Sequence, residues 1–184
     1  MNSFSISDLP IINGENVRLR PISSRDTDLI VAWRNDPEVY RHFIYRGPFT
    51  PEIHENWLKT KVATGEVVQY IIENKAERRP IGSVYLRDID PRHESAEYGI
   101  FIGDAEYHGK GYGTETARLF TRFGLDVLGL HRISLRVLAD NPGARRSYEK
   151  AGFVTEGIAR QMVKLDGSFK DVVFMAILSE EAEA

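Results

Sequence analysis

The chain has 184 residues and a formal net charge of −3, from 24 basic and 27 acidic side chains. Without a basic excess, nucleic acid is not expected as a partner, and the absence of cysteine excludes disulfides and cysteine-bound metals. The five histidines show no metal-ligand spacing, so no metal is expected. No apolar run approaches the ~18 residues of a membrane span, and no signal-peptide pattern is present. These features predict a cytoplasmic protein that does not bind a membrane.

The first half of the chain reads as a strand, two helices and two strands. Residues 17–22 alternate apolar and polar side chains and predict the first strand. Helices are predicted over 25–35 and 50–63, the second with Pro51 in its first turn, and residues 41–48 between them read as irregular. A polar turn then joins two further strands, predicted over 67–73 and 80–88.

The second half alternates strands and helices and ends in a hairpin. Strands are predicted over 95–102 and 132–138, and helices over 114–128 and 144–151. The hairpin pairs 153–164 with 168–178 around an Asp-Gly turn. This order predicts one α+β domain over residues 1–184 with helices on both faces of its sheet. Residues 1–13 would form an N-terminal arm, and residues 179–184 a frayed tail.

A glycine-rich loop joins the strand at 95–102 to the helix that follows it. Its sequence is His108-Gly109-Lys110-Gly111-Tyr112-Gly113-Thr114. Glycine permits positive φ and close approach of the backbone to a ligand. The helix N-terminus after the loop leaves about four N–H groups unpaired and carries roughly half a positive charge. Together these features predict an anion cradle, most naturally for a pyrophosphate. A turn that needs glycine only for packing is the alternative.

Two blocks of sequence resemble the GNAT superfamily of N-acetyltransferases. Residues 108–113 resemble the family's acetyl-CoA loop, [Gln/Arg]-x-x-Gly-x-[Gly/Ala], with His108 where Gln or Arg is usual. Residues 141–153 resemble its Asn-x-x-Ala-x-x-x-Tyr…Gly-Phe signature. The resemblance extends from residue 17 to about residue 178. It implies a mixed, mostly antiparallel central sheet of about seven strands flanked by helices on both faces. That sheet splays between the strands at 95–102 and 132–138.

The resemblance also implies acetyl-CoA as co-substrate and a set of residues that bind it. These are Ile100, Ile102, His108, Gly109, Lys110, Gly111, Tyr112, Gly113, Thr114, Asn141 and Arg145. Because the chain has no cysteine nucleophile, the acetyl group is expected to pass directly to a primary amine in a ternary complex. Use of another acyl-CoA remains an alternative, as does a silent acyl-CoA-binding protein of the same fold.

Two side chains are catalytic candidates. An incoming ammonium must lose a proton, and Glu97, inside an apolar strand, is suited to accept it directly or through water. Glu97 could instead lie on a solvated face. Tyr148 matches the family's tyrosine near the thioester sulfur, where it would protonate the leaving thiolate, although it could be a core aromatic. A backbone N–H at Ile100 or Ile102 would polarise the acetyl carbonyl. Asn141 could simply start a helix, and Arg145 and its neighbour Arg146 could be solvated surface.

The resemblance further implies that the acceptor amine binds at the first two helices and their connection. The candidates are Trp33, Arg34, Asn35 and His54, within an aromatic and polar cluster that resembles a particular subfamily. That subfamily contains ribosomal-protein Nα-acetyltransferases, spermidine acetyltransferases and amino-sugar-nucleotide acetyltransferases. Arg34 and His54 would favour an anionic acceptor, whereas the nearby carboxylates of Asp36, Glu38, Glu52 and Glu55 keep a cationic acceptor open. Trp33 could be a core anchor. Partners would be a small-molecule amine or a protein N-terminus, and a homodimer is left open.

Overall fold

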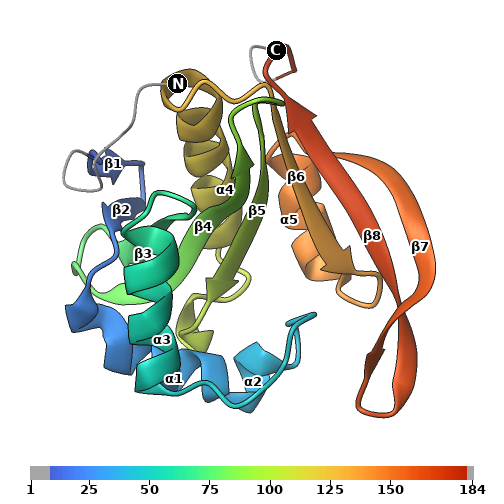
Figure 1. Cartoon of the computed structure of the whole chain (residues 1–184), viewed down its shortest axis with the longest axis horizontal. Coiled ribbons are helices and arrows are strands. Elements are labelled where there is room, and N and C mark those ends of the chain that lie inside the picture. Colours follow the sequence, from blue (N-terminus) through green and yellow to red (C-terminus); the bar gives the residue numbers. More distant parts are fainter. Residues whose placement is uncertain (1–8, 182–184) are drawn as a thin grey trace.

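The computed structural model describes residues 9–181, which build one eight-stranded sheet with helices on both faces (Figure 1). The strands are β1 (Ile12–Asn13), β2 (Val17–Pro21), β3 (Val68–Asn74), β4 (Pro80–Asp90), β5 (Ser95–Ile102), β6 (Arg132–Leu138), β7 (Val154–Leu165) and β8 (Ser168–Leu178). The helices are α1 (Thr27–Asn35), α2 (Pro37–Tyr40), α3 (Pro51–Trp57), α4 (Tyr112–Arg122) and α5 (Pro142–Lys150). The predicted α+β fold is confirmed.

The strands lie in the order β1-β2-β3-β4-β5-β6-β8-β7. All neighbours are antiparallel except β5 and β6, which are parallel, so the predicted mixed, mostly antiparallel sheet is confirmed. The sheet has eight strands rather than about seven because Ile12 and Asn13, placed in the N-terminal arm, pair with β2. Residues 1–8 of that arm and residues 182–184 of the tail lie outside the described residues. In residues 179–181 a turn replaces the expected frayed end, since the Ser179 N–H donates to the His131 carbonyl (2.9 Å).

The short helix α2 is absent from the sequence prediction. Asp36 ends α1 and at once caps α2, because its side chain accepts from the Glu38 N–H (2.9 Å) and Pro37 occupies the first turn. Helices α3 and α5 begin at similar signals, Thr50-Pro51 and Asn141-Pro142. Helix α5 starts at Pro142, two residues earlier than predicted, and Gly152 follows it at φ +103, the left-handed conformation expected there.

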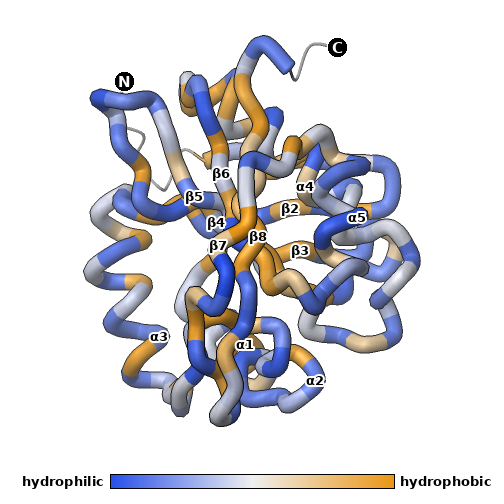
Figure 2. The backbone as a smooth tube through the Cα atoms, turned by 90° about the vertical axis from the view of Figure 1, so that its right-hand side faces the viewer, coloured by the Kyte–Doolittle hydropathy of each residue, from blue (hydrophilic) through white to orange (hydrophobic). Residues whose placement is uncertain are grey.

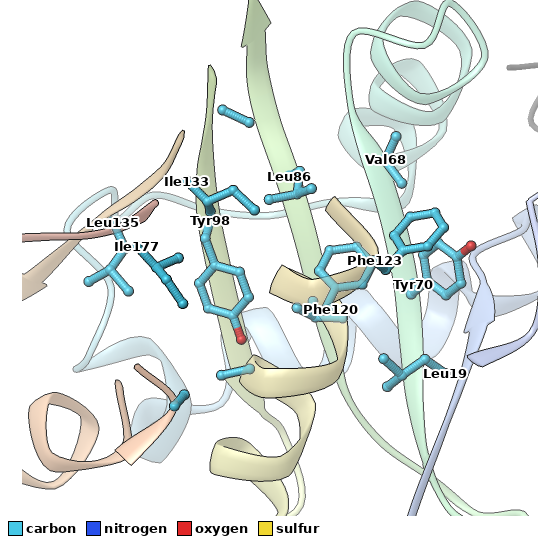
Figure 3. Packing of buried hydrophobic residues seen from close by; sticks show 14 of the residues in the cluster. Leu19, Val68, Tyr70, Leu86, Tyr98, Phe120, Phe123, Ile133, Leu135 and Ile177 are labelled. Carbon is cyan, nitrogen blue, oxygen red and sulfur yellow. The ribbon is translucent and has the colours of Figure 1, made fainter. Parts of the chain in front are cut away.

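Each face of the sheet carries its own hydrophobic core. On one face, Ala117 and Phe120 of α4 and Phe123 directly after it pack against side chains from β2 to β6 and β8, and Figure 3 shows the two phenylalanine rings beside Tyr70. On the other face, α1 and the segment after α3 pack against Ile71 and Phe101. In Figure 2 the hydrophobic stretches gather in the strands at the centre of the molecule. Because β3 is covered on both faces, all seven of its residues are buried, including the polar Gln69, Glu73 and Asn74.

The sheet opens between β5 and β6. The two strands pair over only three positions, from Ser95 opposite Arg132 to Glu97 opposite Ser134. Beyond Glu97 they run apart (Figure 1), while each keeps its pairing to its other neighbour, β4 or β8. The splay expected between these two strands is therefore present, and it leaves backbone groups of β5 without a strand partner.

Candidate active site

A cavity of about 650 Å³ occupies the opening between β5 and β6. It reaches both faces of the sheet. On the α4/α5 face it meets the glycine loop and α5, and on the α1/α2 face it meets α2, the chain after it, and the ends of β4 and β6. The lining residues of the second side are Arg34, Glu38, Val39, His42, Phe43, Ile44, Tyr45, Tyr85, Arg87, Glu97, Phe101 and Arg136.

The glycine loop forms one wall of the cavity. Gly109 (φ +72) and Gly111 (φ +90) both adopt the left-handed conformation, and a Cβ built on either would meet no protein atom within 4 Å. Gly111 is the N-cap of α4, and the first bond within the helix runs from Glu115 N–H to the Gly111 carbonyl (3.0 Å). The N–H groups of the first turn are thus left free beside Gly109, Gly111, Gly113 and Thr114, which line the cavity. This geometry suits a phosphate group.

Helix α5 forms the opposite wall of the same half. Residues spaced three or four apart along it, Gly143, Arg146, Ser147 and Lys150, face the cavity. Arg145 does not line the cavity and instead pairs with Glu149 (3.2 Å) on the same helix. The cationic side chains on this wall are therefore those of Arg146 and Lys150. Lys110 also lies outside the lining, with its ammonium 5.9 Å from the centre of the Tyr107 ring.

The side chains of three other cofactor candidates form hydrogen bonds with nearby protein groups. The Asn141 carboxamide oxygen accepts from the Ala144 N–H (3.1 Å) as the cap of α5, which leaves its amide nitrogen on the cavity side near His42. His108 Nε2 donates to the Ile102 carbonyl (2.9 Å) and so holds the loop against the end of β5. Tyr112 lies outside the cavity, where its hydroxyl accepts from Asn74 (2.9 Å).

The backbone of β5 points specific groups into the opening. Along a strand, the N–H and C=O of one residue point to one neighbour and those of the next residue to the other. The Gly103 N–H bonds Ile81 on β4 (2.8 Å), whereas the carbonyls of Ala96 and Ile102 accept from Ser134 and His108 on the other side. No register shift interrupts β5 between Glu97 and Ile102. The N–H groups of Ile100 and Ile102 therefore face the opening.

Glu97 lies in the cavity wall, held by two arginines from the neighbouring strands. Arg87 on β4 and Arg136 on β6 both donate to its carboxylate, Arg136 through two nitrogens (2.9 and 3.0 Å). The ring of Tyr45 lies near both guanidinium groups, and its hydroxyl accepts from Arg136 (3.1 Å). Glu97 and Arg136 each keep 20% of their side-chain surface exposed, so the cluster is accessible from the cavity.

Tyr148 enters the cavity from the other face. Its ring packs edge-on against Tyr98 and Phe153, with centroids 6.1 and 5.9 Å away. Burial raises the pKa of the Tyr148 phenol well above its usual value of ~10, so the hydroxyl stays protonated near neutral pH. In the described part of the chain this hydroxyl has no hydrogen-bond partner, and it can donate to a bound molecule.

Of the four acceptor candidates, only Arg34 lines the cavity. Trp33 is buried edge-on against Phe101. The Asn35 carboxamide bonds the backbone of Phe49 twice: its nitrogen donates to the Phe49 carbonyl (2.7 Å), and its oxygen accepts from the Phe49 N–H (3.2 Å). His54 is buried, with Nδ1 2.9 Å from the Thr27 hydroxyl, and burial lowers its pKa. These three side chains shape the α1/α3 layer behind the cavity.

Neither a metal site nor a membrane span is found in residues 9–181. No group of three or more His, Asp or Glu side chains there is arranged to hold a metal ion. None of the helices in this part of the chain has the length and apolar character to cross a membrane.

The sequence matches the family model of the acetyltransferase (GNAT) domain over residues 16–154, which is more than half of the chain. The chain belongs to the GNAT family. It is an acetyl-CoA-dependent N-acetyltransferase. The family predicted from the loop and the Asn141 block is thereby confirmed.

Relatives of this GNAT protein include spermidine acetyltransferases. It is 28% identical over 170 residues to spermidine N(1)-acetyltransferase of Escherichia coli, which covers 92% of the chain and 89% of that protein. It is 39% identical over 119 residues to a probable N-acetyltransferase, YjcK, of Bacillus subtilis, covering 64% of the chain and 65% of the relative. Among solved structures, spermidine N-acetyltransferase from Vibrio cholerae in complex with CoA and spermine matches with a TM-score of 0.86 and 26% identity. That match covers 93% of this chain and all of the other.

The sequence alone does not single out several residues of this GNAT cavity. Tyr85, Arg87 and Arg136 lie on strands where alternating polar residues usually face solvent. Arg87 lies directly opposite Glu97 across β4 and β5, so the register of this hairpin would have revealed the pair. The pairing of the two strands shifts between Arg87 and Asp90, so counting residues back from the turn does not predict which residue lies opposite Glu97.

Proposed function

We propose that this GNAT enzyme transfers the acetyl group of acetyl-CoA to a primary amine of a small molecule or a protein N-terminus. The two substrates would be bound together, and the amine would attack the thioester directly. The observation that carries this proposal is the continuity of one cavity, from the glycine loop on one face of the sheet to Glu97 on the other. A donor and an acceptor can therefore meet in the opening between β5 and β6.

The donor would enter along the α4/α5 half of the cavity. Its pyrophosphate fits the free N–H groups after Gly111, with Arg146 and Lys150 contributing positive charge. The thioester then lies along the open edge of β5. The N–H groups of Ile100 and Ile102 are placed to donate to the acetyl oxygen as it gains charge during attack.

The proton balance assigns Glu97 and Tyr148 opposite tasks. Before attack, the incoming ammonium loses one proton to Glu97, through water because both carboxylate oxygens already accept from arginines. As the C–N bond forms, the nitrogen gives its second proton to water, and water returns a proton to Tyr148 once Tyr148 has protonated the thiolate. As the C–S bond breaks, the thiolate takes a proton from the Tyr148 hydroxyl, which has no competing partner in the described residues. Because these groups lie on opposite faces of β5, one proton leaves on the amine side and another arrives on the sulfur side.

Replacing Tyr148 by phenylalanine removes only this proton donor. We expect kcat to fall by about 10- to 100-fold, or ~1.4–2.8 kcal/mol of transition-state stabilisation. CoA affinity and melting temperature should stay near those of the wild type, since the ring still packs against Tyr98 and Phe153. Steady-state kinetics at saturating substrates measure the effect. Turnover by Tyr148→Phe at the wild-type rate would return Tyr148 to a packing role.

Release of free CoA thiol in the presence of an amine panel tests the proposed function. The panel should contain peptide N-termini, polyamines, amino sugars, aminoglycosides and amino acids, each with and without acetyl-CoA. We expect amine-dependent thiol release together with an acetylated product in mass spectrometry. If CoA binds but no amine in the panel accelerates thiol release, the proposed acceptor class is wrong. If a longer acyl-CoA reacts faster than acetyl-CoA, the donor assignment is wrong.

A further inference from the structure

The amine side of the cavity carries more positive than negative charge. Three guanidinium groups line it, from Arg34, Arg87 and Arg136, whereas the carboxylates that line it are those of Glu38 and Glu97. The other acidic candidates for a cationic acceptor, Asp36, Glu52 and Glu55, are absent from the cavity wall. Glu38 is exposed and pairs with Arg41 (3.0 Å), which further reduces the negative potential that it contributes.

Glu97 neutralises only one of the two arginines that it holds. Arg87 and Arg136 share this carboxylate, and a second carboxylate, that of Asp88, lies 3.7 Å from Arg87 but is exposed and outside the cavity, so the side chains of the cluster that line the cavity keep one net positive charge. Tyr45 lies near both guanidinium groups and adds a hydroxyl but no charge. The Glu97 carboxylate is thus flanked by two guanidinium groups, and the electrostatic potential around it is positive.

Arg34 adds a charge that has no counterion. Within residues 9–181 it makes no salt bridge, and its Nε is buried without a hydrogen-bond partner. Its guanidinium lies 4.6 Å from the centre of the Phe43 ring and 4.5 Å from that of Phe49, which fix its position at the cavity wall. Burial lowers the pKa of Arg34, and the nearby charge of Arg87 lowers it further. A bound anion would relieve both penalties.

Taking acetyl transfer to a small amine as proposed above, we propose that the acceptor also carries a carboxylate or phosphate group that Arg34 binds. A guanidinium fork matches the paired oxygens of either acid. The amine of the same molecule would then lie toward Glu97, in the opening between β5 and β6. A polyamine lacks the acid and brings additional positive charges to a positive wall, which disfavours it through like-charge repulsion. The acceptor specificity of this chain therefore differs from that of the spermidine acetyltransferases it resembles.

The test uses four acceptors that share one aminopropyl group and differ in charge at the other end. They are 3-aminopropanol (neutral), 3-aminopropyl phosphate, 4-aminobutanoate (carboxylate) and spermidine (cationic). In the thiol-release assay we expect kcat/KM for at least one anionic acceptor to exceed that of 3-aminopropanol by about 10- to 100-fold. Spermidine should be poorer than 3-aminopropanol. The kcat/KM values of the two anionic acceptors, compared with each other, show whether the site prefers phosphate or carboxylate.

Substitutions at Arg34 then connect the preference to this side chain. Arg34→Gln should reduce the ratio of anionic to neutral kcat/KM to near one, and Arg34→Lys should retain part of it because the charge remains. Arg122→Gln is the matched control, since Arg122, the last residue of α4, forms an exposed pair with Asp126 outside the cavity. It should keep the wild-type ratio. If Arg34→Gln fails to fold, two results still test the inference: the order of kcat/KM values among the four acceptors in the wild type, and the ratio of anionic to neutral kcat/KM in Arg34→Lys.

A binding measurement separates this inference from the proposed function. With CoA saturating, inorganic phosphate should raise the melting temperature of the wild type and raise that of Arg34→Gln less, whereas spermidine should have little effect. If no amine is acetylated, the proposed function fails, and these shifts still test the anion site. Higher kcat/KM or greater stabilisation with spermidine than with the anions would overturn the inference. An anion preference that survives in Arg34→Gln would overturn it as well.

Discussion

Glu97→Gln is expected to lower kcat/KM by about 10- to 1000-fold near neutral pH while leaving acetyl-CoA affinity unchanged. Glutamine keeps the shape of the side chain and one accepting oxygen for Arg87 and Arg136, but it cannot take a proton from the incoming ammonium. The loss should shrink as the pH rises, because a growing fraction of the amine is then already neutral. Kinetics measured from pH 6 to above the pKa of the acceptor amine follow this change.

Glu156→Gln is the matched control for Glu97→Gln. Glu156, on the edge strand β7, also pairs with an arginine, Arg132 on β6, but neither residue lines the cavity. Its replacement should leave kcat/KM within about twofold of the wild type, since an exposed pair contributes little. A loss in Glu97→Gln that is equal at every pH would show that Glu97 positions the arginines and accepts no proton.

Gly111→Val is expected to weaken CoA binding by about 100-fold, or ~2.8 kcal/mol. At φ +90 a branched side chain is strained, and its methyl groups would project into space that is free of protein atoms beside the first turn of α4. That space is where the pyrophosphate is expected to lie. Isothermal titration calorimetry with CoA measures the loss.

Gly65→Val separates the loss of the cradle from the strain itself. Gly65 also has a left-handed conformation (φ +79) with no protein atom near its Cβ position, but it lies in a turn outside the cavity. Both variants should lose stability, whereas only Gly111→Val should lose CoA affinity. Wild-type affinity in a folded Gly111→Val protein would refute the cradle.

Most of the fold could be predicted because local signals and burial agree along the chain. Alternation predicts β2 and β6, and the Asp-Gly turn predicts the β7–β8 hairpin, whose turn residues Asp166 and Gly167 both have positive φ. The sequence prediction lacks α2 because a proline that follows Asp36 indicates only the end of α1. The same residues also cap a new helix, and a stretch of four residues carries too little periodicity to detect.

The two halves of the site differ in how well the sequence predicts them. The glycine loop could be located because its chemistry resides in consecutive backbone groups. The amine side is built by residues from α1, α2, the chain after α2, and strands β4, β5 and β6. The register of the three strands brings Arg87 and Arg136 together at Glu97, and the packing of α1 on the sheet adds Arg34. The sequence prediction therefore groups Trp33, Asn35 and His54 with Arg34, although the side chains of these three residues lie behind the cavity wall.

Initial rates of thiol release, measured while acetyl-CoA and the best amine of the panel are varied together, test the central claim most directly. Direct attack in one continuous cavity requires both substrates to be bound before any product leaves. The account therefore predicts double-reciprocal lines that intersect, and no CoA release in the absence of amine. Parallel lines, with one equivalent of CoA released before the amine is added, would contradict it by revealing an acetylated enzyme.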